Sequence, residues 1–325
     1  MRDLDTAWSE LEPWLDTLEA ERRAGVRRFG WSVPLAGVAG LGVFAAAALA
    51  GAPGQVALVG AGIVAALIAS WGYSPLGALK RKVKLGLNQR VAEAFGLVYR
   101  EAPGEPSGFN ALRRFELLPH ADRKSFEDHF AGEAHGARFE LYEAELQQRR
   151  RTKNRTYYVT VFRGAIIRIA FPRTVEGVTL VTRDKGMFNA FESWGAKTFG
   201  RAGRKLERIG LVDPTFEKLF EVYGTDQVMA RYLLTPSFME RLLELETLLS
   251  GKNVRAVFDE DLAPEAGRGE LLIAAETGNQ FEPGSLFKPL AERARIEAIY
   301  AEIKLIDDII TTLLEPADFR GTEPA

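Results

Sequence analysis

The longest uncharged stretch of the chain runs from Phe29 to Leu79 and contains no Asp, Glu, Lys or Arg. Charged residues make up 26% of the sequence, so random placement does not explain so long a gap. Two apolar segments, Trp31–Ala50 and Val56–Tyr73, lie within it and are joined by the turn Gly51–Gln55. A membrane helix needs about 20 apolar residues. The pattern therefore predicts a transmembrane helical hairpin over residues 31–73.

Two other interpretations of this stretch are weaker. Buried helices of a soluble bundle are disfavoured, because soluble helices normally carry a polar stripe. Gly60, Gly62 and Ala65 have the GxGxxA spacing of a dinucleotide-binding turn. That chemistry requires a carboxylate about 20 residues further on, where Lys80–Leu85 is basic instead. We therefore reject a Rossmann fold.

Basic residues flank the predicted hairpin at both ends, and the turn between its helices has none. They are Arg22, Arg23, Arg27 and Arg28 before the first helix, and Lys80, Arg81, Lys82 and Lys84 after the second. Short flanks rich in Lys and Arg stay cytoplasmic, so we expect a multi-pass protein with both termini in the cytoplasm. Trp31, Trp71 and Tyr73 then fall at the inner interface, which favours amphipathic rings. Small residues would allow close helix packing: Ala36, Gly40, Gly60, Ala61, Ala65 and Ala69.

Some of these cations are the candidate binding residues of the sequence. We predict contacts with anionic lipid headgroups for Arg27, Arg28, Lys80, Arg81, Lys82 and Lys84, since each basic residue near such a surface is attracted by about 1 kcal/mol. The alternative is that these charges only set the topology. A second basic run, residues 149–155, lies at a predicted hairpin tip and is interpreted as a solvated turn. Its alternative is contact with anionic lipid or an acidic partner.

Amphipathic helices are predicted on both sides of the hairpin. Over residues 1–30, helical spacing relates Leu4, Trp8, Leu11, Leu15 and Leu18. Pro13 predicts a break into two short helices. Over residues 74–101, a basic juxtamembrane helix carries the apolar stripe Leu79, Val83, Leu87, Val91 and Phe95. Residues 102–109 are rich in Pro and Gly and predict a linker.

Residues 110–315 are predicted to form a cytosolic α+β domain, followed by a tail over residues 316–325. Short helices are expected at Asn110–Phe115 and at Asp122–Phe130, with Asp122 as the N-cap of the second. Alternating and β-branched residues predict strands at Arg138–Leu146, Thr156–Phe162, Ala165–Phe171, Val178–Thr182, Glu207–Leu211, Leu219–Tyr223, Val254–Phe258 and Glu270–Ala275.

Two further helices complete the expected domain. Thr235 and Pro236 have the residue types of a helix start, and Gly251 those of its end. A long C-terminal helix is predicted over Ser285–Leu314. The expected fold class is an α+β membrane protein: a two-helix transmembrane hairpin, then an antiparallel β-sheet or partly open barrel with inserted helices and the long C-terminal helix.

Composition and motifs indicate no reaction. A net charge of −2 provides no basic field, so we predict no nucleic-acid partner. The chain has no Cys, which excludes disulfides and thiolate sites. His120, His129 and His135 match no metal-ligand spacing and are interpreted as surface or capping residues. No catalytic motif occurs. We predict no cofactor and no metal, and we lean against an enzyme without excluding one.

Several segments together resemble a known family. They are Tyr157–Ile167, Val178–Val181, Tyr223–Gln227, Leu233–Pro236, Leu272–Ala274 and Phe281-Glu282. The chain resembles a bacterial membrane-protein family of unknown function, domain of unknown function (DUF) 3137, over roughly Ala7 to Leu314. The resemblance implies a bacterial source, an inner-membrane location, and a membrane hairpin followed by a strand-rich domain. It implies no reaction, ligand or catalytic residue.

Three hypotheses for function follow. The favoured one is a non-enzymatic inner-membrane protein whose cytosolic domain binds a protein partner, anionic lipid or a second copy of the chain. The second is an enzyme with an unrecognised site in that domain. The third is an accessory subunit of a transport or envelope complex. No ionisable residue lies within the predicted spans, so a proton or ion path through this hairpin alone is disfavoured.

Overall fold

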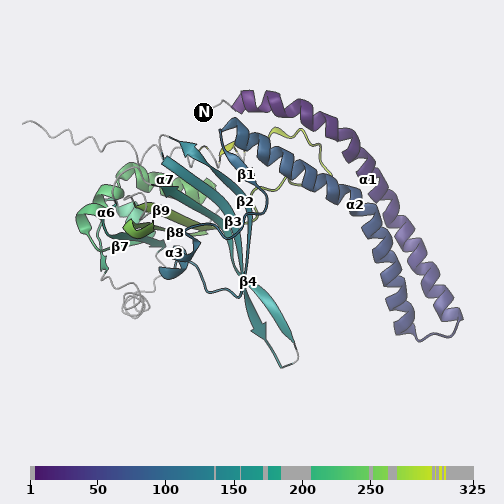
Figure 1. The fold of residues 1–325 in the computed structure, drawn as a ribbon. Coiled ribbons are helices and arrows are strands. Elements are labelled where there is room, and N and C mark those ends of the chain that lie inside the picture. Colours follow the sequence, from purple (N-terminus) through teal and green to yellow (C-terminus); the bar gives the residue numbers. More distant parts are fainter. Residues whose placement is uncertain are drawn as a thin grey trace, which may run out of the picture. The chain divides into compact units, whose positions relative to one another are not determined.

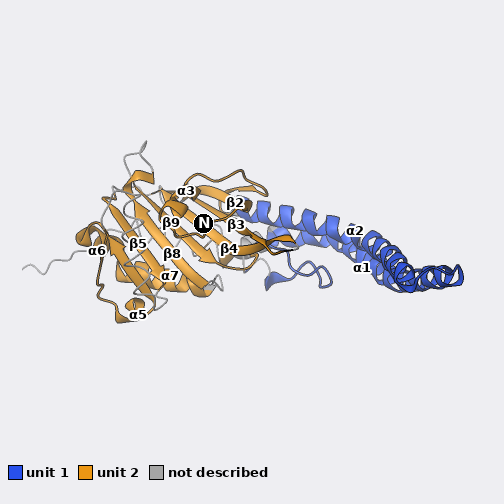
Figure 2. Ribbon diagram, turned by 90° about the horizontal axis from the view of Figure 1, so that it is seen from below, with its two compact units in different colours: residues 1–94, 281–298 blue, residues 95–280, 299–325 orange. Residues whose placement is uncertain are grey.

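The computed structural model describes residues 4–134, 137–153, 155–170, 175–183, 206–248, 252–262, 269–294, 297, 300–301 and 304. The chain divides into two compact units, coloured separately in Figure 2. Unit 1 comprises residues 1–94 and 281–298, and unit 2 comprises residues 95–280 and 299–325. Unit 1 is built on two long helices, and unit 2 on a β-sheet.

The two helices of unit 1 form the expected hairpin. Helix α1 spans Leu4–Leu49 and helix α2 spans Gly54–Ala94 (Figure 1). Gly51 ends α1 with a φ of 77°, the left-handed conformation common after a helix C-terminus. At 1.5 Å per residue the helices are about 69 and about 62 Å long. Both are long and apolar enough to cross a membrane.

The two ends of the hairpin differ in what they bury. At the end of the hairpin away from the turn, the buried apolar residues are Leu11, Leu15 and Leu18 of α1 and Leu76, Leu79, Val83, Leu87 and Val91 of α2. All of these residues except Leu76 belong to the predicted amphipathic stripes, whose burial is confirmed for this part. Toward the turn, the large apolar side chains are instead exposed, with Leu41 at 71% and Leu49 at 91%.

The breaks predicted at proline are wrong. Helix α1 continues through Pro13, and α2 continues through Pro75 without a new start after Ser74. Pro75 has no N–H to donate to the carbonyl of Trp71, but the Ser74 hydroxyl donates to that oxygen at 2.9 Å. Close packing holds the helices together here: a Cβ on Gly72 would lie 1.9 Å from Ser32 Oγ.

The C-terminal helix does not begin at Ser285. Residues 281–292 have irregular backbone, and helical residues occur only from position 293. Pro289 explains this, because proline disfavours helix both at its own position and at the one before it. Buried Phe281, Leu286 and Leu290 attach this segment to unit 1. The apolar positions of the predicted helix at Ile299, Ile303, Ile306, Ile310 and Leu313 lie outside the described residues.

Unit 2 contains one nine-stranded antiparallel sheet, as expected. Its strands are β1 Val98–Arg100, β2 Arg123–Ala134, β3 Ala137–Arg151, β4 Thr156–Ala170, β5 Val178–Arg183, β6 Glu207–Arg208, β7 Phe220–Gly224, β8 Lys252–Asp259 and β9 Glu270–Glu276. Their order is β1-β2-β3-β4-β9-β8-β5-β7-β6. The sheet is open, with β1 and β6 at its edges, so it does not close into a barrel.

Short helices accompany the sheet: α3 Phe109–Arg114, α5 Pro214–Glu217, α6 Gln227–Leu233, α7 Pro236–Leu248 and the 3-10 turn η1 Glu260–Leu262. The predicted N-cap of α7 is confirmed, since the Phe238 N–H donates to Thr235 Oγ1 at 3.2 Å. Phe238 packs on Phe258 of β8. On the opposite face, α3 contributes Phe109 and Leu112 to a core with Tyr142, Ile166 and Leu272.

Two predictions need correction where the structure has the strands β2 and β4. Residues 122–130, expected as a helix, lie mostly in β2, and Asp122 accepts a bond from the Arg149 N–H at 2.7 Å. Residues 156–170 form one strand without the turn expected at Arg163-Gly164. Gly164 is needed for close approach, because a Cβ there would lie 1.9 Å from the Ala275 carbonyl oxygen of β9.

This contact predicts the effect of replacing Gly164. We expect Gly164→Ala to lower the free energy of unfolding by about 1–3 kcal/mol, the usual cost of overpacking against atoms that cannot move aside. Thermal unfolding of the full chain in detergent, followed by circular dichroism, measures the loss. Gly278→Ala is the matched control, because nothing lies within 4 Å of its Cβ position. Equal melting temperatures for the two variants would contradict the packing.

Candidate functional site

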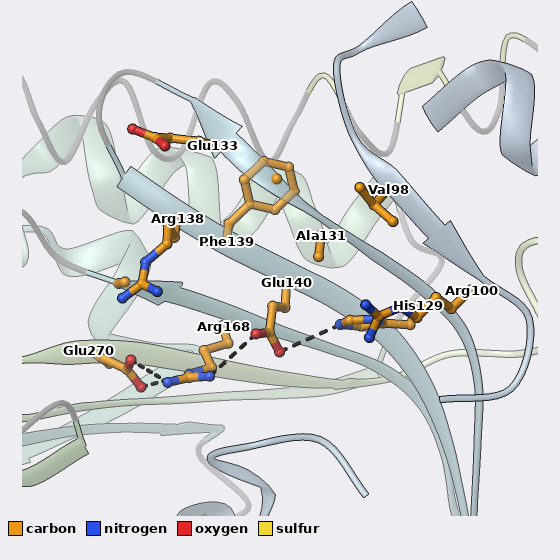
Figure 3. Close-up of a pocket in the computed structure, with 12 residues that line it drawn as sticks. Val98, Arg100, His129, Ala131, Glu133, Arg138, Phe139, Glu140, Arg168 and Glu270 are labelled. Atoms are coloured by element: carbon orange, nitrogen blue, oxygen red, sulfur yellow. Dashed lines mark hydrogen bonds and ion pairs between the residues drawn. The ribbon is translucent and has the colours of Figure 1, made fainter. Parts of the chain in front are cut away.

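A cavity of about 510 Å³ lies over β1 to β4 and β9 of unit 2 (Figure 3). Its polar lining combines cationic and anionic groups: Arg100, His129, Glu133, Arg138, Glu140, Arg168 and Glu270. Val98, Ala131, Gly132, Phe139 and Ala170 complete the wall. Most small-molecule sites are lined mainly by apolar side chains, so a lining this rich in charge suits a polar or ionic ligand rather than an apolar one.

Strand register places most of these residues on one face. Directly opposed residues of antiparallel strands point to the same side of a sheet. Three such pairs cross the cavity: Arg100 with His129, Ala131 with Glu140, and Glu140 with Arg168. Glu270 of β9 opposes Ala170 two positions beyond Arg168. The site is therefore a row of charges that runs across neighbouring strands rather than along one.

A β-bulge brings His129 into this row. The register of β2 against β3 slips by one residue between Glu127 and Phe130. Asp128 has a φ of 52° there, and its carboxylate accepts a bond from the Tyr99 hydroxyl at 2.6 Å. A one-residue slip reverses which face the following side chains occupy. The bulge thus sends Phe130 to the other face and leaves His129 on the side of Glu140.

Charged contacts join four of the side chains (Figure 3). Arg168 and Glu270 form a bidentate pair, with Nε–Oε2 at 2.7 Å and Nη2–Oε1 at 2.5 Å. Arg168 Nη1 lies 3.4 Å from Glu140 Oε1. His129 Nε2 lies 3.5 Å from Glu140 Oε2. Glu270 is 1% exposed, so Arg168 compensates a charge that water cannot reach.

The neighbours of these groups shift their pKa values. The pKa of Glu140 is lowered, chiefly by the His129 imidazole and against the opposing effect of burial, with a further contribution from Arg168. Burial disfavours charged Arg168, but the bonds and charge of Glu270 outweigh it and raise the pKa of Arg168. Burial also raises the pKa of Tyr142. Glu140 therefore stays a carboxylate to a lower pH than an ordinary glutamate does.

Some polar atoms of the cavity have no partner among the described residues. His129 is only 8% exposed; its Nε2 has the 3.5 Å contact with Glu140, and its Nδ1 has no hydrogen-bond partner there. Arg100 and Arg138 are exposed, and their guanidinium groups have no ion pair among the described residues. Three nitrogen-bearing groups are thus available to an anionic ligand, with Glu133 as an opposing charge on the rim. Within the described ranges, no group of three His, Asp or Glu side chains suits a metal ion.

The cations predicted to contact lipid lie in unit 1 and have different surroundings. Lys80 and Lys84 share Glu282, at 2.6 and 2.8 Å. Lys82 pairs with Glu21 at 2.9 Å. Arg28 lies over the Trp71 ring, 3.9 Å from its centroid. Arg27 and Arg81 are exposed. Of the six cations predicted to contact lipid, the structure therefore brings Lys80 and Lys84 together, and both pair with Glu282 of the same unit.

The Glu282 cluster has a structural role. Burial acts to raise the pKa of Glu282, but hydrogen bonds from Lys80 and Lys84 outweigh it and lower that pKa. Lys84 is 9% exposed. Arg22 and Asn88 donate to the carbonyls of Leu286 and Phe281, at 3.1 and 3.2 Å. These bonds fix the irregular segment after Gln280 to the helices of its unit.

Of the three histidines, one has a different environment from the expected surface or capping role. His120 is exposed, His129 lines the cavity, and His135 lies outside the described residues. No sequence pattern distinguishes His129, since its position depends on the bulge and on a partner strand. The cavity residues were all missed for that reason: they come from five strands and share no motif.

A family model matches part of the chain. Residues 160–314 match the model described as "Protein of unknown function (DUF3137)". The resemblance noted in the sequence is confirmed, over a shorter stretch than the one expected from Ala7. Within the cavity, Arg168 and Glu270 fall inside the DUF3137 segment, whereas Arg100, His129 and Glu140 precede it.

The other comparisons add little. A search of the curated proteins finds no match. Among solved structures, the chain is similar to the "crystal structure of the mycobacterial trehalose monomycolate transport factor A, TtfA", with 12% sequence identity. The similarity covers 73% of this chain and 98% of that one, at a TM-score of 0.34. So low a score supports no argument from that protein to this chain.

The lowered pKa of Glu140 predicts a pH dependence. The unfolded carboxyl, at its ordinary value of 4.5, takes up a proton at higher pH than the folded one. Stability from this group is therefore complete above that value and is lost as the pH falls through the lowered pKa. We expect Glu140→Gln to flatten the decline of the melting temperature as the pH falls below the ordinary pKa of 4.5.

Thermal melts above and below that pH, in detergent, measure the difference. Glu133→Gln is the matched control, since Glu133 lies on the same cavity rim but is exposed. If Glu140→Gln kept the wild-type dependence on pH, the interaction with His129 and Arg168 would contribute nothing.

Proposed function

We propose that this is a two-pass protein of the bacterial inner membrane, with both termini in the cytoplasm. Its nine-stranded unit serves there as a binding module for a protein partner or anionic lipid. One observation carries the membrane part of the proposal. Of the 22 large apolar side chains that are exposed in the described residues, 14 lie between Trp31 and Tyr73.

Magnitudes favour a bilayer over water around this stretch. Burying a large apolar side chain is worth about 1.5–3 kcal/mol, so 14 half-exposed ones forgo on the order of 10–20 kcal/mol. That matches or exceeds the whole stability of a typical domain, about 5–15 kcal/mol. A core helix of a soluble protein is mostly buried. In the most apolar windows of α1 and α2, only 17% and 11% of the residues are buried.

Charge and aromatic placement support the orientation. Cations cluster where the hairpin meets the rest of the chain, and the turn after Leu49 has no charge. Trp31, Trp71 and Tyr73 are 74%, 58% and 44% exposed at the same end of the spans. Amphipathic rings at that level and Lys/Arg-rich flanks both favour the cytoplasmic interface. Arg27, Arg81 and Lys82 are the exposed candidates for lipid headgroup contact.

Reporter fusions test this topology. We expect a reporter inserted at Gly54 and one fused to the C-terminus to report opposite sides of the inner membrane. A phosphatase active only in the periplasm and a fluorescent protein active only in the cytoplasm give complementary readouts. Fusion at Gln89, in the juxtamembrane part of α2, is the control and should agree with the C-terminus. Cytoplasmic signals at all three positions would contradict the membrane hairpin.

A second candidate function is recognition of a small anionic molecule in the cavity. The favouring observation is buried His129, whose Nε2 faces Glu140 but whose Nδ1 has no hydrogen-bond partner among the described residues. A buried polar group without a partner is costly, and a carboxylate or phosphate between His129, Arg100 and Arg138 would remove that cost. The same cavity would hold the active site if the chain were an enzyme. An accessory role in a transport or envelope complex is a further alternative.

Thermal stability in added anions tests this candidate. We expect inorganic phosphate or citrate to raise the melting temperature of the full chain relative to chloride at equal ionic strength. A ligand present at ten times its dissociation constant stabilises by about 1.4 kcal/mol. The double variant Arg100→Gln with Arg138→Gln should lose the response, and Lys218→Gln, a distant exposed residue, should keep it. An unchanged response in the double variant would contradict the site.

A further inference from the structure

We propose that the tip of the β3–β4 hairpin binds the anionic headgroup surface of a bilayer. We call residues 148–160 the arm. The inference deepens the proposed function and rests on it, because the membrane hairpin keeps such a surface within reach of the same chain.

The arm is a part of the sheet that has only two strands. Strand β2 pairs with β3 up to Gln147, and β9 pairs with β4 from Gly164 onward. Beyond those positions, β3 and β4 pair only with each other, from Gln148 opposite Val159 to Arg151 opposite Thr156. Figure 1 shows this hairpin extending past the neighbouring strands. Its side chains therefore face solvent on both sides of the ribbon.

Contacts at its root hold the arm in place. An isolated two-stranded ribbon is marginal in water, so the arm needs support. The Arg149 N–H donates to Asp122 Oδ2, and Gln148 Nε2 to the His120 carbonyl, both at 2.7 Å. The Arg123 guanidinium lies 3.5 Å from the centroid of the Tyr158 ring. At the tip, the Thr152 N–H donates to the Arg155 carbonyl at 2.9 Å.

The charge of the arm is strongly positive and uncompensated. Its cations are Arg149, Arg150, Arg151, Lys153 and Arg155, all exposed. No Asp or Glu occurs between Glu145 and Glu176 in the sequence. None of the five cations has an ion pair within the part of the chain that the structure describes. Each basic residue near an anionic bilayer raises the partition constant by about fivefold.

Apolar groups beside these cations favour a bilayer over other polyanions. Tyr157, Tyr158 and Val159 are 42%, 36% and 39% exposed. Arg149 opposes Tyr158, and Arg150 opposes Tyr157, so each face of the ribbon carries one cation beside one phenol ring. Tyrosine is favoured at the headgroup level. The same chemistry on both faces suits a tip that enters a headgroup layer, whereas a folded partner would contact one face.

A label at the tip tests the proposal in the full chain. The protein has no Cys, so Thr152→Cys gives a single attachment point for an environment-sensitive fluorophore. The labelled chain is placed in nanodiscs of phosphatidylcholine alone or with 30% phosphatidylglycerol. We expect a blue shift and protection from iodide quenching only with phosphatidylglycerol. Val212→Cys, at a residue 91% exposed on unit 2, is the control site and should show neither change.

The second part of the experiment removes positive charge from the arm. Replacing Arg149, Arg150 and Arg151 with Gln lowers the partition constant on the order of 100-fold, so protection at residue 152 should disappear. Circular dichroism checks that this variant remains folded. If it misfolds, raising the salt concentration with the parent chain must remove the protection instead. Persistence of protection in both tests would overturn the proposal.

Other outcomes are also decisive. Absence of protection with phosphatidylglycerol, while the chain stays in the nanodiscs, would overturn lipid binding by the arm and leave the membrane hairpin intact. Failure of the chain to enter nanodiscs would overturn the proposed function itself. Protection in phosphatidylcholine nanodiscs by an acidic peptide or by RNA, but not by phosphatidylglycerol, would assign the arm to a protein or nucleic-acid partner.

Discussion

Apolar surface that the protein does not cover is the constraint on which this account depends. Over residues 31–73, the helices α1 and α2 present large apolar side chains outward. At the end of the hairpin away from the turn, the same two helices bury an apolar stripe that includes Leu15 and Val83. The proposed bilayer around residues 31–73 would make both halves of one helix pair favourable. The proposed location, orientation and role of the basic groups all follow from that difference.

The sheet unit shows a second principle, which is that charge is retained in its interior only with compensation. Glu270 is nearly inaccessible but forms a bidentate pair with Arg168. Asp259 is likewise buried and pairs with Arg114. His129 follows this rule only in part, because its Nε2 lies 3.5 Å from Glu140 Oε2 but its Nδ1 has no hydrogen-bond partner among the described residues. That exception, together with two unpaired arginines on the rim, distinguishes the cavity from ordinary structural ion pairs.

Sequence periodicity predicted much of this architecture and failed where pairing overrides local pattern. The hairpin, the strands β3, β5 and β7 to β9, and the cap of α7 follow from spacing and turn chemistry. Phe126 and Phe130 are four residues apart and suggest a helix, but they lie on opposite faces of β2 because of the bulge. Gly164 resembles a turn residue, yet it serves close packing between strands. Pro75 does not interrupt its helix, since the Ser74 hydroxyl donates to the carbonyl that proline leaves unpaired.

The candidate site was less accessible to sequence reasoning than the fold. The cations predicted to contact lipid were selected by their proximity to apolar segments, but proximity did not predict that Lys84 is buried against Glu282. The cavity residues belong to strands far apart in the sequence, and their convergence depends on register. The positive charge of the arm was visible in the sequence as a basic run. The sequence did not show that β2 and β9 stop pairing before the arm, which leaves these cations exposed on a two-stranded ribbon.

Alkaline carbonate extraction tests the central claim most directly. Bacterial membranes that contain the full chain are washed at high pH, which strips proteins held only by charge or by a partner. The account predicts that the chain remains with the membrane pellet, since the apolar surface of residues 31–73 is held by the bilayer core. Release of the chain into the supernatant as a folded protein would contradict it.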